Sequence, residues 1–240
     1  DDLGRKTMPR VPRSLLLVPL AGALLATAAH ADVVAGWTIE APVPSGTSGP
    51  EYSYGAAEQG ANIAGSDLNG VHASPETFWI SPPGNGSQYS FGNNRWTIGD
   101  YFQVEASTLG YQDISISFDQ CRNSNGAVFF DLLMSVDEGA SWTTLLSSYE
   151  VLQSGGGGSP GTWSASADRN PIYLVEADAG AMAADRESVW FRMQAVSEPG
   201  SAVSSISRLD NVFIEGNVVP APGAMALLGL AGLASRRRRR

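Results

Sequence analysis

The fold class is decided by residues 110–119, which read Gly-Tyr-Gln-Asp-Ile-Ser-Ile-Ser-Phe-Asp. Ile114, Ile116 and Phe118 alternate strictly with polar residues, which is the period of a strand that buries one face. An amphipathic helix would instead repeat its apolar residues every three or four positions. This stretch therefore predicts a β-strand that packs its isoleucine and phenylalanine side chains into a core.

The same two-residue period recurs along much of the chain. Its apolar members are Phe102 and Val104; Val128, Phe130, Leu132, Met134 and Val136; Val189, Phe191 and Met193; Val212 and Ile214; with residues 33–40 as a first strand. Clusters of Gly, Pro, Asn and Ser separate these segments, as is typical of turns. Only the short, alanine-rich segment 175–184 has a partly helical period. Many strands with turn-rich connections predict an antiparallel two-layer β-sandwich rather than an α/β domain.

The first 31 residues have the composition of a secretory signal peptide. Arg10 and Arg13 form a basic region, residues 15–26 form an apolar region, and Ala29 and Ala31 flank His30 in an A-x-A cleavage site. We expect a cleavable signal helix, removal by signal peptidase, and Asp32 as the mature N-terminus. An N-terminal membrane anchor would need a longer apolar run.

The other end combines a proline motif, a short apolar run and a basic cluster. Pro220, Ala221 and Pro222 precede the twelve-residue apolar run 223–234. A membrane-spanning helix needs roughly 20 residues, so this run is too short for a permanent anchor. The cluster consists of Arg236, Arg237, Arg238, Arg239 and Arg240. This arrangement resembles the PEP-CTERM sorting tail of bacterial exported proteins, although Ala221 stands where that motif has Glu. The resemblance implies a short hydrophobic helix, transient membrane insertion and cleavage by an exosortase-like enzyme.

The predicted domains are residues 1–31 as upstream and signal segment, 32–216 as the sandwich, and 217–240 as linker and sorting tail. Residues 32–219 contain six arginines, no lysine and 22 acidic side chains. Such an acidic surface disfavours binding to nucleic acid and to anionic lipid. Cys121 and His72 are the only cysteine and histidine of this part, which excludes an intrachain disulfide and a zinc site of the structural type.

Four strings in the middle of the chain resemble those of bacterial exported β-sandwich modules. They are Trp96–Phe102 (WTIGDYF), Gly110–Ile114 (GYQDI), Ser135–Gly139 (SVDEG) and Arg208–Val212 (RLDNV). The resemblance covers most of residues 33–216. It implies a jelly-roll-like sandwich and no established activity.

Residues 135–142, Ser-Val-Asp-Glu-Gly-Ala-Ser-Trp, match the Asp-box pattern S-x-D-x-G-x-[ST]-W. Asp137 is expected to accept hydrogen bonds from turn amides, Gly139 to adopt a positive φ, and Trp142 to pack against the turn. Sialidases carry several such boxes, but a propeller needs repeats and this chain has one copy. The pattern favours a structural hairpin turn.

Two segments contain oxygen ligands suited to a structural Ca²⁺. One is the expected turn 66–70, with Asp67 and Asn69; the other is an expected acidic loop with Glu176, Asp178, Asp185 and Glu187. Neither has the spacing of a complete calcium loop, so a solvated acidic segment is the alternative interpretation.

One strand carries a row of side chains suited to a sugar. Trp190, Arg192 and Gln194 alternate with apolar residues, and Tyr101 and Gln103 are expected on the equivalent face of their own strand. A ring face and hydrogen-bonding groups side by side suit a polar, ring-shaped ligand. Alternatively, the connection 150–185 covers this face and buries Trp190.

These features predict an exported protein of the cell surface or extracellular matrix that adheres to or organises polysaccharide. Two alternatives stay open: a secreted carbohydrate-active hydrolase, and a structural matrix component without a specific ligand. Only carboxylate-based hydrolysis remains chemically accessible, because a serine or cysteine triad would have to recruit His72. A deep cleft with two facing carboxylates would favour the hydrolase, whereas a flat or grooved face with exposed tryptophan would favour binding.

Overall fold

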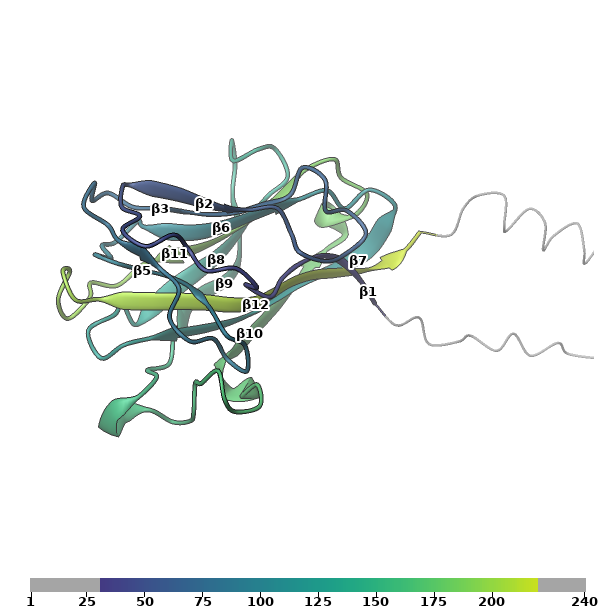
Figure 1. Cartoon of the computed structure of the whole chain (residues 1–240). Helices are drawn as coiled ribbons and strands as arrows, with labels where there is room; N and C mark the ends of the chain where they lie inside the picture. The colour runs from purple at the N-terminus through teal and green to yellow at the C-terminus, as the bar shows by residue number, and fades with distance from the viewer. Residues whose placement is uncertain (1–30, 220–240) are drawn as a thin grey trace, which may run out of the picture.

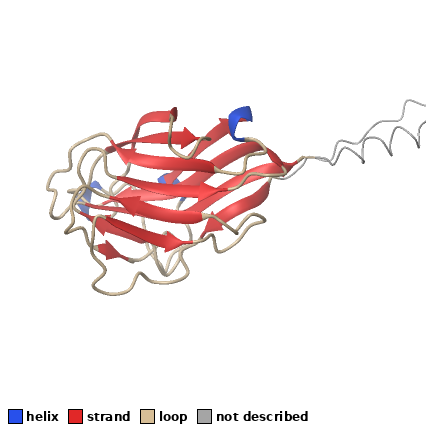
Figure 2. Cartoon of the chain, turned by 90° about the horizontal axis from the view of Figure 1, so that it is seen from above, coloured by secondary structure: helices blue, strands red, loops and turns tan. Residues whose placement is uncertain are grey.

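The computed structural model describes residues 31–219, which form two antiparallel sheets packed face to face (Figures 1 and 2). The first sheet contains β1 (Asp32–Trp37), β4 (Trp79–Ile80), β5 (Phe91–Asn94), β7 (Tyr111–Arg122), β10 (Leu174–Gly180) and β12 (Ile206–Val218). The second contains β2 (Glu51–Gly55), β3 (Asp67–Val71), β6 (Tyr101–Ala106), β8 (Phe129–Ser135), β9 (Thr143–Glu150) and β11 (Val189–Ala195). The predicted antiparallel two-layer sandwich is confirmed. The expected terminal helices lie outside the described residues.

The two long strands β7 and β12 are the centre of the first sheet, whose order is β10-β7-β12-β5-β4. β1 also pairs with β12, and Asp32 lies opposite Gly216. Because this pairing is antiparallel, both ends of the described chain leave the sandwich at the same end (Figure 1). The second sheet has the order β2-β3-β6-β11-β8-β9.

Apolar side chains from both sheets meet in one core. The residues expected there have no solvent exposure: Ile114, Ile116, Phe118, Phe130, Leu132, Phe191 and Ile214. Large aromatic side chains complete the core, and Trp79 stacks on Phe91 with ring centroids 5.6 Å apart. Each such side chain contributes roughly 1.5–3 kcal/mol when it leaves water, so this core is the main source of stability.

The segment around Asp67 was predicted as a turn and is instead the strand β3. Leu68 and Gly70 are buried, and Asp67 and Asn69 point away from the core. Asp and Asn favour turns locally, but pairing with both β2 and β6 outweighs that preference. Gly70 is needed for packing, because a Cβ there would lie 2.5 Å from the Trp79 ring.

Three further segments differ from expectation. Glu176 and Asp178 were expected in an acidic loop, but the segment 174–180 is strand β10, because Val175 and Ala177 pack against the core while Glu176 and Asp178 are exposed. Only the short 3-10 helix Ala181–Ala183 follows it. The strand expected from residues 128–136 spans only Phe129–Ser135, and the first strand ends at Trp37.

Short 3-10 helices are the only helices in the described part: Gly156–Gly158, Pro171–Tyr173 and Ala181–Ala183. No helix within residues 31–219 has the length and hydropathy to cross a membrane.

Candidate functional site: the outer face of the second sheet

The order of the second sheet brings two predicted groups of residues together. β6 lies between β3 and β11, so Asn69 is opposite Gln103, which is in turn opposite Arg192. Asp67 is opposite Glu105 in the same way, and Glu105 is opposite Trp190. We call the following set the outer face: Asp67, Asn69, Tyr101, Gln103, Glu105, Trp142, Trp190, Arg192 and Gln194. Candidate metal ligands and candidate sugar-binding residues therefore share one surface.

Arg192 is held between two aromatic rings at the centre of this face. Its Cζ lies 3.7 Å from the centroid of the Tyr101 ring and 4.0 Å from that of Trp142. Its Nε and Nη2 both donate to Gln103 Oε1, at 2.9 and 2.7 Å. Burial lowers the pKa of Arg192, and Tyr101 and Glu105 partly offset that effect. The result is a planar cation with a fixed orientation between two rings.

Trp142 reaches this position through the hairpin turn between β8 and β9. Asp137 accepts hydrogen bonds from the Ser135 and Ser141 hydroxyls and from the Ser141 amide. The Ser141 hydroxyl is the main reason that the pKa of Asp137 is lowered to about 2. Gly139 has a φ of 83°, which a residue with a Cβ resists. The turn therefore fixes the direction in which Trp142 projects.

Trp190 is half-buried on the outer face. Its ring centroid lies 6.5 Å from that of Trp142, and its Nε1 donates to Ser188. A Cβ on Gly139 would lie 3.0 Å from the Trp190 ring. The turn 137–142 thus packs against Trp190. In the predicted alternative, the connection 150–185 would have covered Trp190 instead.

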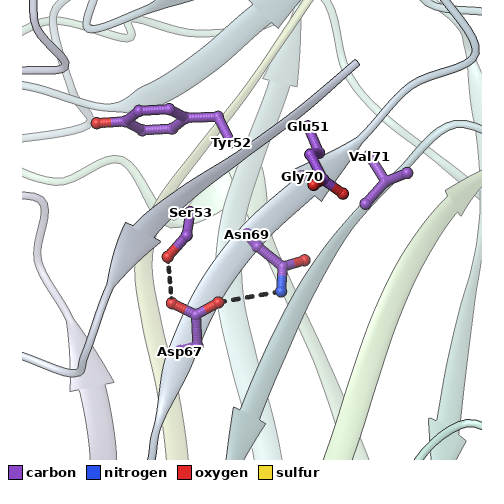
Figure 3. A pocket seen from close by; sticks show the side chains of 7 residues that line it. All are labelled: Glu51, Tyr52, Ser53, Asp67, Asn69, Gly70 and Val71. Carbon is purple, nitrogen blue, oxygen red and sulfur yellow. Dashed lines mark hydrogen bonds between the residues drawn. The ribbon is translucent and has the colours of Figure 1, made fainter. Parts of the chain in front are cut away.

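Glu105 and Asp67 form an acidic part of the outer face. Gln103 Nε2 donates a hydrogen bond to Glu105 Oε1 at 2.8 Å. Burial is the main cause of a raised pKa of Glu105, and the charges of Asp67 and Glu138 raise it further. Asp67 accepts hydrogen bonds from Ser53 and Asn69 (Figure 3). Asp67, Asn69 and Ser53 also line a groove of about 470 Å³ that is formed by β2 and β3.

The other two candidate metal ligands lie elsewhere. Asp178 is on β10 opposite Ser115, and its Oδ1 accepts from the Gly180 amide at 2.7 Å. Asp185 lies after β10, and its Oδ1 accepts from the Gly110 amide at 2.9 Å. Neither joins Asp67 and Asn69. Across residues 31–219, no group of three or more His, Cys, Asp or Glu side chains is arranged to hold a metal ion. A structural Ca²⁺ stays a prediction.

The sequence singled out Gln103 together with Tyr101, but not Trp142 or Glu105, for this face. The alternation of residues 101–105 already places Gln103 and Glu105 on the side of Tyr101, so that signal was present. Trp142 had no such signal, because its direction depends on the geometry of a turn.

The chain matches no protein-family model, and no curated protein matches it significantly. Among solved structures it is similar to TmCBM61 in complex with beta-1,4-galactotriose, with 10% identity and a TM-score of 0.36 over 63% of this chain and 88% of that one. It is similar to the K1 cleaved adhesin domain of Lys-gingipain from Porphyromonas gingivalis, with 13% identity and a TM-score of 0.40 over 76% and 97%. It is also similar to the CBM22-1–GH10 modules of Clostridium thermocellum xylanase 10B complexed with xylohexaose, with 14% identity and a TM-score of 0.41 over 79% of this chain and 30% of that one. At these identities the likeness concerns the fold alone.

Proposed function

We propose that this protein binds polysaccharide through the outer face of the second sheet, as an exported component of the cell surface or extracellular matrix. The observation that carries the proposal is the position of the Arg192 guanidinium between the Tyr101 and Trp142 rings. This arrangement lies on a sheet face that is not covered by another layer of the described chain.

The chemistry of the face suits a carbohydrate. Aromatic rings offer apolar surfaces to the C–H faces of sugar rings, while Trp190 and Trp142 together extend that surface along the sheet. Gln194 and Asn69 offer amide groups, and Asp67 and Glu105 offer acceptors to sugar hydroxyls. A few polar groups around aromatic surface is the usual composition of a ligand site.

Export and sorting belong to the same proposal. They rest on the sequence of residues 1–31 and 220–240, with signal peptidase and an exosortase-like enzyme as processing partners. Both ends of the described chain leave the sandwich at one end. A tail attached there would leave the outer face, along the side of the sandwich, accessible to an extracellular polymer.

A glycan array probed with purified residues 32–219, with and without Ca²⁺, tests the proposal. These residues contain every described strand of both sheets, so the core is complete. We expect binding to a restricted set of glycans and loss of it in the Trp142→Ala, Arg192→Ala double variant. Binding to no glycan would refute the proposal and favour the structural matrix component. Undiminished binding by a stably folded double variant would place the ligand on another surface.

The hydrolase is a second candidate function, and one observation favours it. Asp67 and Glu105 lie directly opposite each other, and burial raises the pKa of Glu105. A carboxyl group with a raised pKa beside a second carboxyl group is an arrangement that glycosidases use for acid and nucleophile. Release of reducing ends from a bound polysaccharide, abolished in Glu105→Gln, would support this candidate. Binding without turnover would refute it.

A further inference from the structure

The two carboxylates of the outer face have no cationic partner within the described chain. Asp67 and Glu105 face each other across β3 and β6, and neither forms an ion pair there. Like charges directly opposite on neighbouring strands destabilise a sheet. Glu138 adds a third negative charge that acts on Glu105.

Arg192 lies on the same face, and the charge of Glu105 raises its pKa, but Arg192 forms no ion pair with Glu105 or Asp67. Two of its N–H groups are used on Gln103 Oε1, and its faces are covered by Tyr101 and Trp142. Arg192 instead fixes the orientation of the Gln103 side-chain amide. Because Oε1 of Gln103 points to Arg192, its Nε2 points to Glu105 and donates to it.

Arg192, Gln103 and Glu105 are therefore one connected chain of hydrogen bonds. It begins at the aromatic stack and ends at a carboxylate beside Asp67. Asp67 is held in turn by Ser53 and Asn69, and all three line the groove of about 470 Å³ (Figure 3). Adjacent strands lie about 4.8 Å apart and alternate residues about 7 Å apart. An oligosaccharide that contacts Trp142 thus also reaches Asp67 and Glu105.

We propose that the polysaccharide bound by the outer face is an amino-sugar polymer with free amino groups, and that Asp67 and Glu105 receive its ammonium group. The inference rests on the proposed function and specifies its ligand class. An ammonium donates three hydrogen bonds and carries the charge that the pair lacks. Uronic acid polymers carry the opposite charge and are disfavoured on this face.

The test compares chito-oligosaccharides of one length, with free and with acetylated amino groups, by titration calorimetry at about pH 6. We expect the free-amine chain to bind at least about tenfold more tightly, a difference of about 1.4 kcal/mol. The Asp67→Asn, Glu105→Gln variant should lose this preference and bind the two chains with equal affinity.

The matched control is Glu176→Gln, Asp178→Asn, which removes two exposed carboxylates from the first sheet and leaves the outer face intact. If it loses the preference equally, the effect comes from net charge and the inference is wrong. Equal affinity for the two chains also overturns the inference, while the proposed function stands. Binding of neither chain, nor of any other glycan, overturns both. A preference that persists in the Asp67, Glu105 variant places the amine elsewhere and overturns the inference alone.

Discussion

Asp119 of β7 and Asp210 of β12 lie directly opposite each other, and neither side chain reaches solvent. Arg169 donates to both oxygens of Asp119, at 2.7 and 2.8 Å. Asp210 Oδ2 accepts hydrogen bonds from the Asn85 backbone amide and the Ser87 hydroxyl, both at 2.7 Å. Burial raises the pKa of Asp210 to about 7, and the charge of Asp119 adds to this. Through these hydrogen bonds, Asp119 connects the segment that contains Arg169 to the first sheet, and Asp210 connects the segment that contains Asn85 and Ser87.

Stability should therefore decrease as the pH rises through the titration of Asp210. The folded state prefers protonated Asp210, so this contribution is complete below the unfolded pKa near 4 and is lost by about pH 7. The slope is at most about 1.4 kcal/mol per pH unit, and other carboxyl groups reduce it. Urea unfolding of the protein and of Asp210→Asn across this range measures it. Parallel pH profiles of the two proteins would contradict the assignment.

Arg192→Lys should weaken glycan binding although the charge is kept. Lysine has no planar group to lie between Tyr101 and Trp142, and it cannot make both bonds to Gln103 Oε1. We expect about a tenfold loss of affinity by calorimetry, or ~1.4 kcal/mol. Arg186→Lys is the control, because the Arg186 side chain donates to the Met182 carbonyl and does not belong to the outer face. Equal affinities of both variants would count against a role for the stacked guanidinium.

Gly139→Val should destabilise the fold by about 1–3 kcal/mol, since φ is 83° at this position. A side chain there also meets the rings of Trp190 and Trp142. Gly110→Val is the matched control: its φ is 80°, but no atom lies within 4 Å of the added Cβ. Thermal unfolding should detect both, whereas a change in tryptophan fluorescence should appear only in Gly139→Val. An unchanged melting temperature in Gly139→Val would show that the turn is not constrained.

Gly70→Ala should cost about 1–3 kcal/mol by overpacking, because the added Cβ would lie 2.5 Å from the Trp79 ring. Gly92→Ala, also in a strand, meets its nearest atom at 3.3 Å and should cost less. Chemical denaturation compares the two variants. A larger loss in Gly92→Ala would contradict the packing account.

Mass spectrometry of the envelope fraction should find Asp32 as the N-terminus and no peptide containing Arg236 to Arg240. This follows from the signal-peptide pattern and from an apolar run of twelve residues, too short for a permanent span. Recovery of the arginine cluster on most molecules would show that the tail is retained.

The fold could be predicted because its signal is local. Alternation at Ile114, Ile116 and Phe118 assigns both the strand and its buried face within a few residues, and the structure confirms it. Prediction from local patterns failed where the same residues suit both a turn and a strand. Asp67, Asn69 and Gly70 are common turn residues, and only pairing with β2 and β6 makes them a strand.

By itself, the sequence determined the sandwich class, most core residues, the acidic surface and the expected targeting segments at both ends. Tertiary structure alone decided that Asp67 and Arg192 belong to one surface, because β6 separates the strands that carry them and each pairing spans a long sequence distance. It also decided that Trp142 covers Arg192, since the turn at Gly139 sets that direction. The period of a strand depends on adjacent residues, whereas the order of strands depends on long-range pairing that no short window of sequence contains.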